Sequence, residues 1–408
     1  MNIQVVRDVD YLIGIPISLI LSIIYSIKRA LGFGNLDWNE APKKVLFIEL
    51  SEMGSTVMAY HAMKRLKALY PKAELYFLVF KTNLESVKIL DLIPEKNIFT
   101  IRDKKFGEFI IDALALLPKL WKARIDTTID FELFSRFTAI ISFLSGAKRR
   151  IGFYRFYSEG LYRGNFHTHK VQYNPHMHIS QNFLALVLSL KAPQNEIPML
   201  KVQLFREKIE RKHIEVSKEA KQKILNKLKA INPSINEKSK LIVIDPNYSW
   251  AIPMRSWPTE NYAKLAKMLL RAPNTFVLLT GTIASGSENA KYICSKVQNE
   301  RCIDLTGKFA LNEFIEVLGT ADVVITHDSG PAHFGSITGT KVIVMFGPES
   351  PKVYAPLGEN VKAIYANYAC APCVSAFNER HSACNNNKCM QAISVEEVYG
   401  VVQKALRN

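Results

Sequence analysis

The chain has 408 residues, of which 48% are hydrophobic and 22% charged, and its formal net charge is +16. The length exceeds what one hydrophobic core usually supports, so two domains are expected, and the composition excludes a disordered chain. The basic surplus favours an anionic partner such as a membrane surface or a phosphorylated substrate, since no zinc finger, RNA-binding signature or long basic run supports nucleic acid.

The first element is an uncharged apolar run over residues 11–27, YLIGIPISLILSIIYSI, which Lys28 and Arg29 follow. It is slightly short for a membrane span, which needs about 20 apolar residues. Serines recur in it every four positions, at Ser18, Ser22 and Ser26. This pattern is typical of a helix in a membrane interface and predicts a membrane-associating segment over residues 1–36, with a core helix of the first domain as the alternative.

The next segment alternates between strand and helix patterns. KVLFIEL at 44–50 predicts a buried strand that ends at the glycine-containing turn SEMGS. Further elements are expected as a helix at 56–69, a strand at 74–80, a strand within 123–132 and a helix at 134–144. Such alternation specifies a parallel sheet with helices on both faces, so a Rossmann-like domain is predicted over 44–200.

An aromatic and basic stretch over 152–178, GFYRFYSEGLYRGNFHTHKVQYNPHMH, interrupts this alternation. Long irregular segments in compact domains are usually functional, which predicts an acceptor-binding or membrane-facing loop. The stretch contains two His-x-His pairs, His167 with His169 and His176 with His178. No carboxylate or cysteine accompanies them in a recognisable ligand pattern, so surface or substrate contacts are favoured over a metal.

A second alternating block follows a charged helix around 217–230. Its strands are expected at 241–245, 275–280, 302–305, 322–326 and 341–346. The block predicts a second Rossmann-like domain over 207–390, followed by a C-terminal helix at 391–408. Two such domains facing each other leave a cleft, and open parallel sheets bind ligands at the carboxyl ends of their strands.

The segment ADVVITHDSGPAHFGSITGTKVIVMFGP, residues 321–348, is the most informative for function. A strand ends before the turn HDSG, and Pro331 fits the first turn of a helix, where its missing donor costs nothing. The free amides of that helix end can hold a diphosphate, and Gly330 lets the backbone come close to it. The alternative is purely local, because Asp328 and Ser329 are also good helix caps.

DSGPAH followed by KVIVMFGPESP resembles glycosyltransferase family nine, the bacterial ADP-heptose:lipopolysaccharide heptosyltransferases. Three further segments are similar to the family: KVLFIELSEMGS, GAKRRIGF and RSWPTENYAKLAKML. The resemblance extends from about Lys44 to the C-terminus. It implies an α/β fold of the GT-B type, with an acceptor domain and a nucleotide-sugar domain facing each other. It also implies an inverting transfer that requires no metal or other cofactor.

The resemblance also implies residue roles. The donor's diphosphate and sugar are expected to contact four residues of the DSGPAH segment: Asp328, Ser329, Gly330 and His333. Arg255 stands where the family has a basic residue and is expected to neutralise phosphate charge. Glu288 aligns with an acidic residue that binds the ribose of the nucleotide, and Asn247 is expected at the mouth of the same cleft.

The first loop, which contains Met53, Gly54 and Ser55, departs from the family. Family members usually have an aspartate directly after the glycine, where this chain has Ser55. Serine cannot take the proton of the acceptor hydroxyl at neutral pH without help, and a positioned base is worth roughly 10²- to 10⁴-fold in rate. Glu52 on the same loop is therefore the first candidate base and Glu49 the second, unless Glu52 is only a solvated turn residue.

Four of the six cysteines lie close together near the C-terminus, at Cys370, Cys373, Cys384 and Cys389. Their spacing is compatible with a structural zinc site or an iron–sulfur cluster, and disulfides or reduced thiols are the alternatives. The rest of the chain shows no disulfide framework, which agrees with a reducing compartment. In every case the thiols are expected to lie outside the active site.

Together these features predict a cell-envelope glycosyltransferase at the cytoplasmic face of the inner membrane, attached as a peripheral or monotopic protein. Its expected partners are a nucleotide-sugar donor, a glycolipid acceptor of the lipopolysaccharide type and an anionic membrane surface, without nucleic acid. The alternative enzyme is a sugar-nucleotide epimerase that shares the fold and the donor site. A membrane-attached binding protein without catalysis is the non-enzymatic alternative, because Ser55 replaces the usual aspartate.

Overall fold

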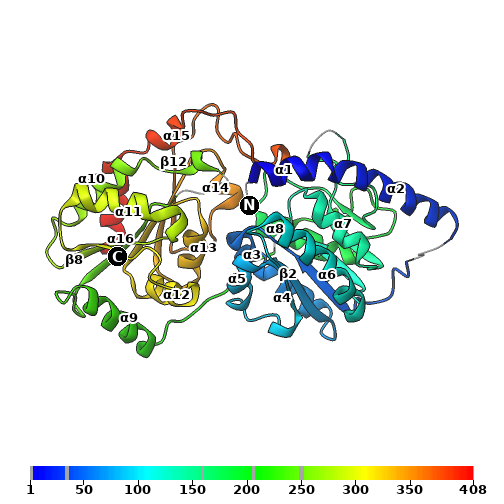
Figure 1. Ribbon diagram of the computed structural model, residues 1–408, viewed down its shortest axis with the longest axis horizontal. Coiled ribbons are helices and arrows are strands. Elements are labelled where there is room, and N and C mark those ends of the chain that lie inside the picture. The colour runs from blue at the N-terminus through cyan, green and yellow to red at the C-terminus, as the bar shows by residue number, and fades with distance from the viewer. Residues whose placement is uncertain (1–2, 33–35, 158–159, 205–206, 248–251, 408) are drawn as a thin grey trace. The chain divides into compact units, whose positions relative to one another are not determined.

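The computed structural model describes residues 3–32, 36–157, 160–204, 207–247 and 252–407. The chain divides into two compact units (Figure 1). Unit 1 comprises Met1–Glu210 and Ala376–Arg380, and unit 2 comprises Arg211–Ser375 and His381–Asn408. Each unit contains a six-stranded sheet. The prediction of two Rossmann-like α/β domains is therefore confirmed.

The sheet of unit 1 has the strand order β3-β2-β1-β4-β5-β6, and all neighbouring strands are parallel. The strands are β1 (Lys44–Ile48), β2 (Glu74–Phe80), β3 (Ile98–Ile101), β4 (Thr127–Asp130), β5 (Arg149–Phe153) and β6 (His169–Val171). The chain runs from β1 to one edge and returns at β4 toward the other. The neighbours β1 and β4 thus form the switch point at which parallel sheets bind ligands.

Helices cover both faces of this sheet. They are α1 (Ile3–Leu12), α2 (Gly14–Ala30), α3 (Met53–Met58), α4 (Tyr60–Leu69), α5 (Leu84–Lys88), α6 (Phe106–Ala123), α7 (Arg136–Leu144) and α8 (Ile179–Leu188), with short 3-10 turns at Lys81–Asn83, Glu95–Asn97 and Ser189–Lys191. Successive strand residues point to opposite faces. Leu46 of β1 packs in one cluster with Leu116 and Leu120 of α6, whereas the ring of Phe47 stacks on Phe131 at 5.3 Å on the other face.

The helix predicted over 56–69 is divided into α3 and α4 at Ala59, and α3 already begins at Met53. The first-loop residues Met53, Gly54 and Ser55 therefore form the first turn of α3, and Glu52 is its N-cap residue. This position brings the Glu52 side chain to the carboxyl end of β1.

The N-terminal helix α2 packs on α7 through its serine stripe. Ser18 and Ser22 are buried, and the Asn165 amide donates a 2.7 Å hydrogen bond to Ser22 Oγ. Among the described residues, one helical stretch, Val6–Ala30, is long and apolar enough to cross a membrane, with a mean hydropathy of 1.8. Only 17% of its most apolar window is buried. Ser18 and Ser22 thus face the protein, whereas Ser26 and most of the large apolar side chains of α2 are exposed.

The prediction of an irregular stretch over 152–178 is partly wrong. It contains strand β6, and His167 and His169 are buried in unit 1 rather than exposed for surface contacts. Burial lowers the pKa of His169 to about 3, with nearby arginines adding to the effect, so the ring is neutral. His178 instead caps α8, because its Nδ1 accepts a 3.2 Å hydrogen bond from the Ser180 amide. These histidines serve packing and capping.

Unit 2 has the strand order β12-β11-β10-β7-β8-β9, again entirely parallel. Its strands are β7 (Lys240–Asp245), β8 (Thr275–Leu279), β9 (Cys302–Asp304), β10 (Val323–His327), β11 (Lys341–Phe346) and β12 (Val361–Tyr365). The switch point lies between β7 and β10. The segments that follow these two strands carry Asn247 and the DSGPAH motif.

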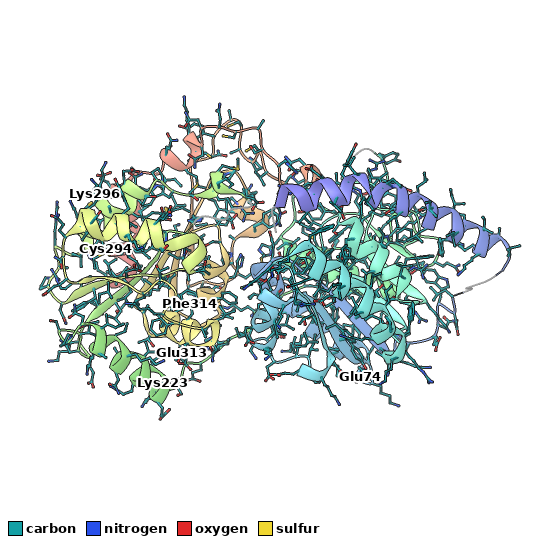
Figure 2. The ribbon with its side chains drawn as sticks, in the orientation of Figure 1. Glu74, Lys223, Cys294, Lys296, Glu313 and Phe314 are labelled. Carbon is teal, nitrogen blue, oxygen red and sulfur yellow. The ribbon has the colours of Figure 1, made fainter. Side chains whose placement is uncertain are left out.

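The helices of unit 2 are α9 (Lys218–Ile231), α10 (Thr259–Leu269), α11 (Ile283–Val297), α12 (Leu311–Thr320), α13 (Gly330–Ile337), α14 (Pro351–Tyr354), α15 (Lys388–Gln391) and α16 (Val395–Arg407), with a 3-10 turn at Pro253–Arg255. The helices α9 and α12 lie together, and Lys223 Nζ forms a 3.5 Å ion pair with Glu313, both labelled in Figure 2. Trp257 Nε1 donates a 2.9 Å hydrogen bond to the Ile393 carbonyl, which anchors the C-terminal segment to the core.

Candidate functional site

The first part of the candidate site is the N-terminus of α13 in unit 2. Ser329 is the N-cap residue in extended conformation, and its side chain makes no capping hydrogen bond. Its hydroxyl instead donates to the His327 carbonyl at 3.1 Å and lies 2.9 Å from Thr326 Oγ1. The interpretation of Ser329 as a side-chain cap is therefore wrong, and the first amides of α13 are not occupied by it.

The approach to these amides is open within unit 2. Ser329, Gly330 and Pro331 are only partly buried. A Cβ atom added at Gly330 would find one atom within 4 Å, Phe334 Cε2 at 3.8 Å. Because unpaired helix amides and the helix dipole attract anions, this end of α13 can receive a phosphate group. His333 lies in the same helix and is buried.

Behind this helix end, Arg255 is held by two carboxylates. Arg255 Nε lies 3.3 Å from Asp328 Oδ2, and its Nη2 pairs with Glu349 Oε2. Burial alone would lower the pKa of Arg255, but the charges of Asp328 and Glu349 outweigh burial and raise it. Burial in turn raises the pKa of Glu349, with Arg255 opposing the shift. Arg255 thus lies in a buried ion-pair cluster with Asp328 and Glu349 behind the end of α13.

The sequence reasoning missed Glu349. A signal was present, because Glu349 belongs to the segment GPES, which directly follows strand β11. Its partner could not be deduced from this position. The pairing depends on how residue 255, far earlier in the chain, enters the core of unit 2.

The side-chain amide of Asn247 forms hydrogen bonds within unit 2. Its Nδ2 donates to Asp245 Oδ1 at 3.0 Å and to the Thr280 carbonyl at 3.0 Å. Burial raises the pKa of Asp245 to about 7, and the hydrogen bonds from Asn247 and Thr280 oppose that rise. Asn247 therefore shapes the end of β7. Glu288 is exposed on α11, and its contact with the ribose stays a prediction.

The second part of the candidate site is the end of β1 in unit 1. Ser55 Oγ donates a 3.0 Å hydrogen bond to Glu52 Oε2, and Arg380 Nη1 pairs with Glu52 Oε1. The Glu52 carboxylate thus has a partner for each oxygen. The interpretation of Glu52 as a merely solvated turn residue is wrong, because two side chains hold it beside the position at which the family usually has an aspartate.

Further carboxyl groups gather around this point. Glu132 Oε1 accepts hydrogen bonds from the amides of Leu50 and Ser51, at 2.8 and 3.0 Å. Glu49 is buried, and burial raises its pKa well above the ordinary value, with the charge of Glu132 adding to the effect. At neutral pH Glu49 therefore holds its proton more firmly than an exposed glutamate, which makes it a weaker base candidate than Glu52.

Arg380 reaches Glu52 through the segment Ala376–Arg380, which belongs to unit 1 although the flanking chain belongs to unit 2. Phe377 packs against Phe134 and Tyr173 at ring distances of 6.0 and 5.4 Å. Glu379 and Arg380 both have positive φ angles, 52° and 57°, which non-glycine residues seldom adopt. The sequence reasoning missed Arg380, and no motif pointed to it.

The C-terminal cysteines are neighbours in space. Burial raises the pKa of the Cys389 thiol, and the charges of Cys373, Cys384 and Cys370 add to the shift. The structure contains no disulfide among these four cysteines. Within the described ranges, no group of three or more His, Cys, Asp or Glu side chains is arranged to hold a metal. The zinc or iron–sulfur alternative stays a prediction without support from this arrangement.

Comparisons with known proteins agree with the two-unit architecture. The chain is 27% identical over 184 residues to lipooligosaccharide heptosyltransferase 2 of Campylobacter jejuni, covering 45% of this chain and 56% of that protein. It is 24% identical to lipopolysaccharide core heptosyltransferase OpsX of Haemophilus influenzae, covering 81% and 87%. The structure of ADP-heptose lipopolysaccharide heptosyltransferase II of Escherichia coli superposes with a TM-score of 0.68 at 20% identity, covering 89% and 98%.

The Campylobacter match spans only about half of that relative, whereas the family match covers more of this chain. Residues 116–383 match the sequence model of glycosyltransferase family 9 (heptosyltransferase). This region includes the end of α6, the whole sheet of unit 2 and the segment that carries Arg380. The chain therefore belongs to glycosyltransferase family 9.

Proposed function

We propose that this protein transfers a heptose or similar sugar from a nucleotide diphosphate to a glycolipid acceptor of the lipopolysaccharide type. Membership in family 9 supports the reaction class, and the names of the matched relatives support the sugar and the acceptor. The observation that carries the proposal is the N-terminus of α13, which Ser329 leaves uncapped and which is open at Gly330.

The donor's diphosphate binds at this helix end in the proposed complex. The leaving nucleoside diphosphate gains negative charge in the transition state, and preorganised donors stabilise such charge best. The α13 amides and Arg255 supply positive potential at fixed positions, so we propose that no divalent cation is required. Asp328 and Glu349 hold the Arg255 guanidinium in place.

Glu52 is the proposed base for the acceptor hydroxyl. An inverting transfer is a single displacement in which the acceptor oxygen attacks the anomeric carbon while its proton passes to a base. Ser55 stands where family members usually have an aspartate, and its hydroxyl donates to the Glu52 carboxylate at 3.0 Å. Glu52 therefore compensates for the missing aspartate, and Arg380 orients it.

The test uses Glu52→Gln, with Ser55→Ala as the matched control. We expect Glu52→Gln to bind nucleotide sugar normally but to lower transfer of labelled sugar into lipid extract at least about a hundredfold, because the base is lost. Ser55→Ala removes one hydrogen bond and should keep most of the turnover. Full activity of Glu52→Gln would refute the role of Glu52.

The same labelled-donor experiment separates the alternative functions. A transferase moves label from sugar nucleotide to lipid, an epimerase changes the sugar nucleotide alone, and a binding protein does neither. We further propose attachment at the cytoplasmic face of the inner membrane through the outward apolar side of α2. This position brings a lipid-linked acceptor to unit 1.

A further inference from the structure

The outward side of α6 is apolar, which is unusual for a helix on the surface of a globular domain. Its exposed large side chains are Phe106 (42% exposed), Ile110 (40%), Ile111 (63%), Leu114 (66%) and Trp121 (55%). Their spacing of three or four residues and its multiples places most of them along one side of the helix. Surface helices normally turn apolar residues inward and polar residues to water.

These side chains do not belong to the core of unit 1. The inward side of α6 supplies other residues, Leu116 and Leu120, which are buried against β1 and β2. The indole Nε1 of Trp121 donates a 2.8 Å hydrogen bond to the Leu144 carbonyl, while the side chain stays more than half exposed. A tryptophan with a satisfied polar atom and an exposed ring is typical of membrane interfaces.

Helix α7 packs against α2 and meets α6 through an aromatic pair, so the two outward sides belong to one layer of helices (Figure 1). The ring of Phe109 on α6 lies 4.8 Å from Phe137 on α7, and Tyr25 on α2 lies 6.3 Å from Phe143 on α7. The partly buried residues of α7 are all apolar: Phe137, Ile140, Phe143 and Leu144. No charged side chain of α7 therefore separates the two apolar surfaces.

The charges around this layer are mainly basic. The acidic residues of α6, Glu108 and Asp112, are paired with Arg102 at 3.8 and 2.7 Å. Exposed basic residues flank the apolar side of α6 and the end of α2: Lys104, Lys105, Lys119, Lys122, Arg124, Lys28 and Arg29. Lysines are depleted in the cores of protein interfaces, whereas basic residues beside an apolar helix face favour anionic lipid headgroups.

We propose that α6 is a second membrane-docking element, which inserts its outward side into the headgroup and acyl boundary of an anionic bilayer next to α2. Insertion of two neighbouring helices fixes the orientation of unit 1 on the membrane, which one helix alone does not. The inference rests on the proposed function in one respect, the location of the acceptor in the membrane. Vesicle binding tests it independently of turnover.

The experiment compares the full chain with the double variant Ile111→Glu/Leu114→Glu in flotation with vesicles of phosphatidylglycerol and phosphatidylcholine. Two buried aliphatic side chains are lost from the lipid and two negative charges are added, so binding should weaken at least about tenfold. The matched control is Ile231→Glu, which changes a 41% exposed residue at the end of α9 and should leave binding unchanged. Thermal melting confirms that each variant is folded.

Two further measurements keep the outcomes distinct. Wild-type binding should fall when phosphatidylglycerol is omitted, and equal binding by the double variant would overturn the proposal. Sedimentation without vesicles tests whether a second copy of this chain covers the surface instead. A dimer that forms in the wild type and is lost in the double variant would show such an interface and overturn the proposal. Weaker vesicle binding by the variant, in a protein that transfers no sugar, would refute the proposed function but not the docking surface.

Discussion

At the scale of single residues, the candidate site of unit 1 depends on one buried cation. Burial lowers the pKa of Arg380 to about 10, with Glu49 opposing the shift and Arg7 adding to it. Its guanidinium remains charged at neutral pH and pairs with Glu52. The unusual backbone at Glu379 and Arg380 brings this charge to the end of β1, and such strained positions occur often at functional sites.

We expect Arg380→Gln to lower kcat at least about tenfold without weakening donor binding, because Glu52 loses the partner that orients it. Arg380→Lys should restore part of kcat, since it keeps the charge. Glu379→Gln is the control in the same segment and should leave kcat unchanged while it loosens the contact to Arg136. Steady-state kinetics and donor titration provide the measurements, and a Tm change with normal kcat would reduce Arg380 to a structural role.

Asp245 predicts a pH dependence of stability. Burial raises its pKa from 3.8 to about 7 in the folded state. Between these values the folded protein binds a proton that the unfolded chain has released, so the free energy of unfolding decreases as the pH rises through this window. Asp245→Asn removes this contribution. Urea unfolding at several pH values from about 4 to 8 should show a flatter dependence for the variant, and an identical dependence would refute the assignment.

At the scale of elements, α13 predicts an effect on binding that is separable from folding. The backbone of Gly330 is not in the left-handed region, and an added Cβ would meet only Phe334 at 3.8 Å. Gly330→Ala should therefore fold normally, and alanine is the better helix former. A methyl group between the phosphate and the amides should nevertheless weaken donor binding about tenfold or more. Calorimetric titration with a nucleotide sugar tests this, with Gly400→Ala on α16 as the control.

The N-terminal helix shows which structural features the local sequence predicts. The serine spacing correctly indicated a helix with one weakly polar stripe, because helical periodicity is a local property. That this stripe would lie against α7 depended on partners elsewhere, such as the Asn165 amide. The prediction for the irregular stretch was partly wrong for the same reason. His167 and His169 have polar side chains, which predicted surface contacts, but the packing of β5 and β6 buries them.

At the scale of the whole molecule, the N-terminal helices are part of unit 1 rather than a detachable anchor. Asp10 accepts hydrogen bonds from Arg136 Nη1 and the Phe137 amide, both at 2.9 Å. Leu21 packs with Ala139 and Phe166 in one buried cluster. The proposed attachment of these helices to a membrane would therefore involve the fold of unit 1 itself.

Deletion of residues 1–36 should thus lower the free energy of unfolding by at least about 2 kcal/mol, since Arg136 loses Asp10 and buried apolar surface becomes exposed. Leu12→Ser is the control, because Leu12 is 69% exposed and should contribute little. Urea unfolding of the full chain and the truncated chain provides the measurement. Equal stability would mean that these helices only anchor the protein.

The local pattern of residues determined the two α/β units and the position at which helix α13 begins. Alternating strand and helix signals predicted β2 at 74–80 and β11 at 341–346 with the observed bounds, because burial of a parallel strand imprints a continuous apolar run. Pro331 likewise marked the start of α13, since its ring fixes φ at a value that suits the first turn of a helix.

Only the tertiary structure decided which charges share a site. Glu52 was identifiable from its place near Ser55, but its partner Arg380 lies more than 300 positions later in the sequence. Likewise, Glu349 pairs with Arg255 inside unit 2 although the two are distant in the sequence. Ion-pair partners and pKa shifts arise from burial and from the proximity of distant segments, which sequence spacing does not encode. The apolar side of α6 has the same origin, because its periodicity predicts a helix and packing alone decides which side faces outward.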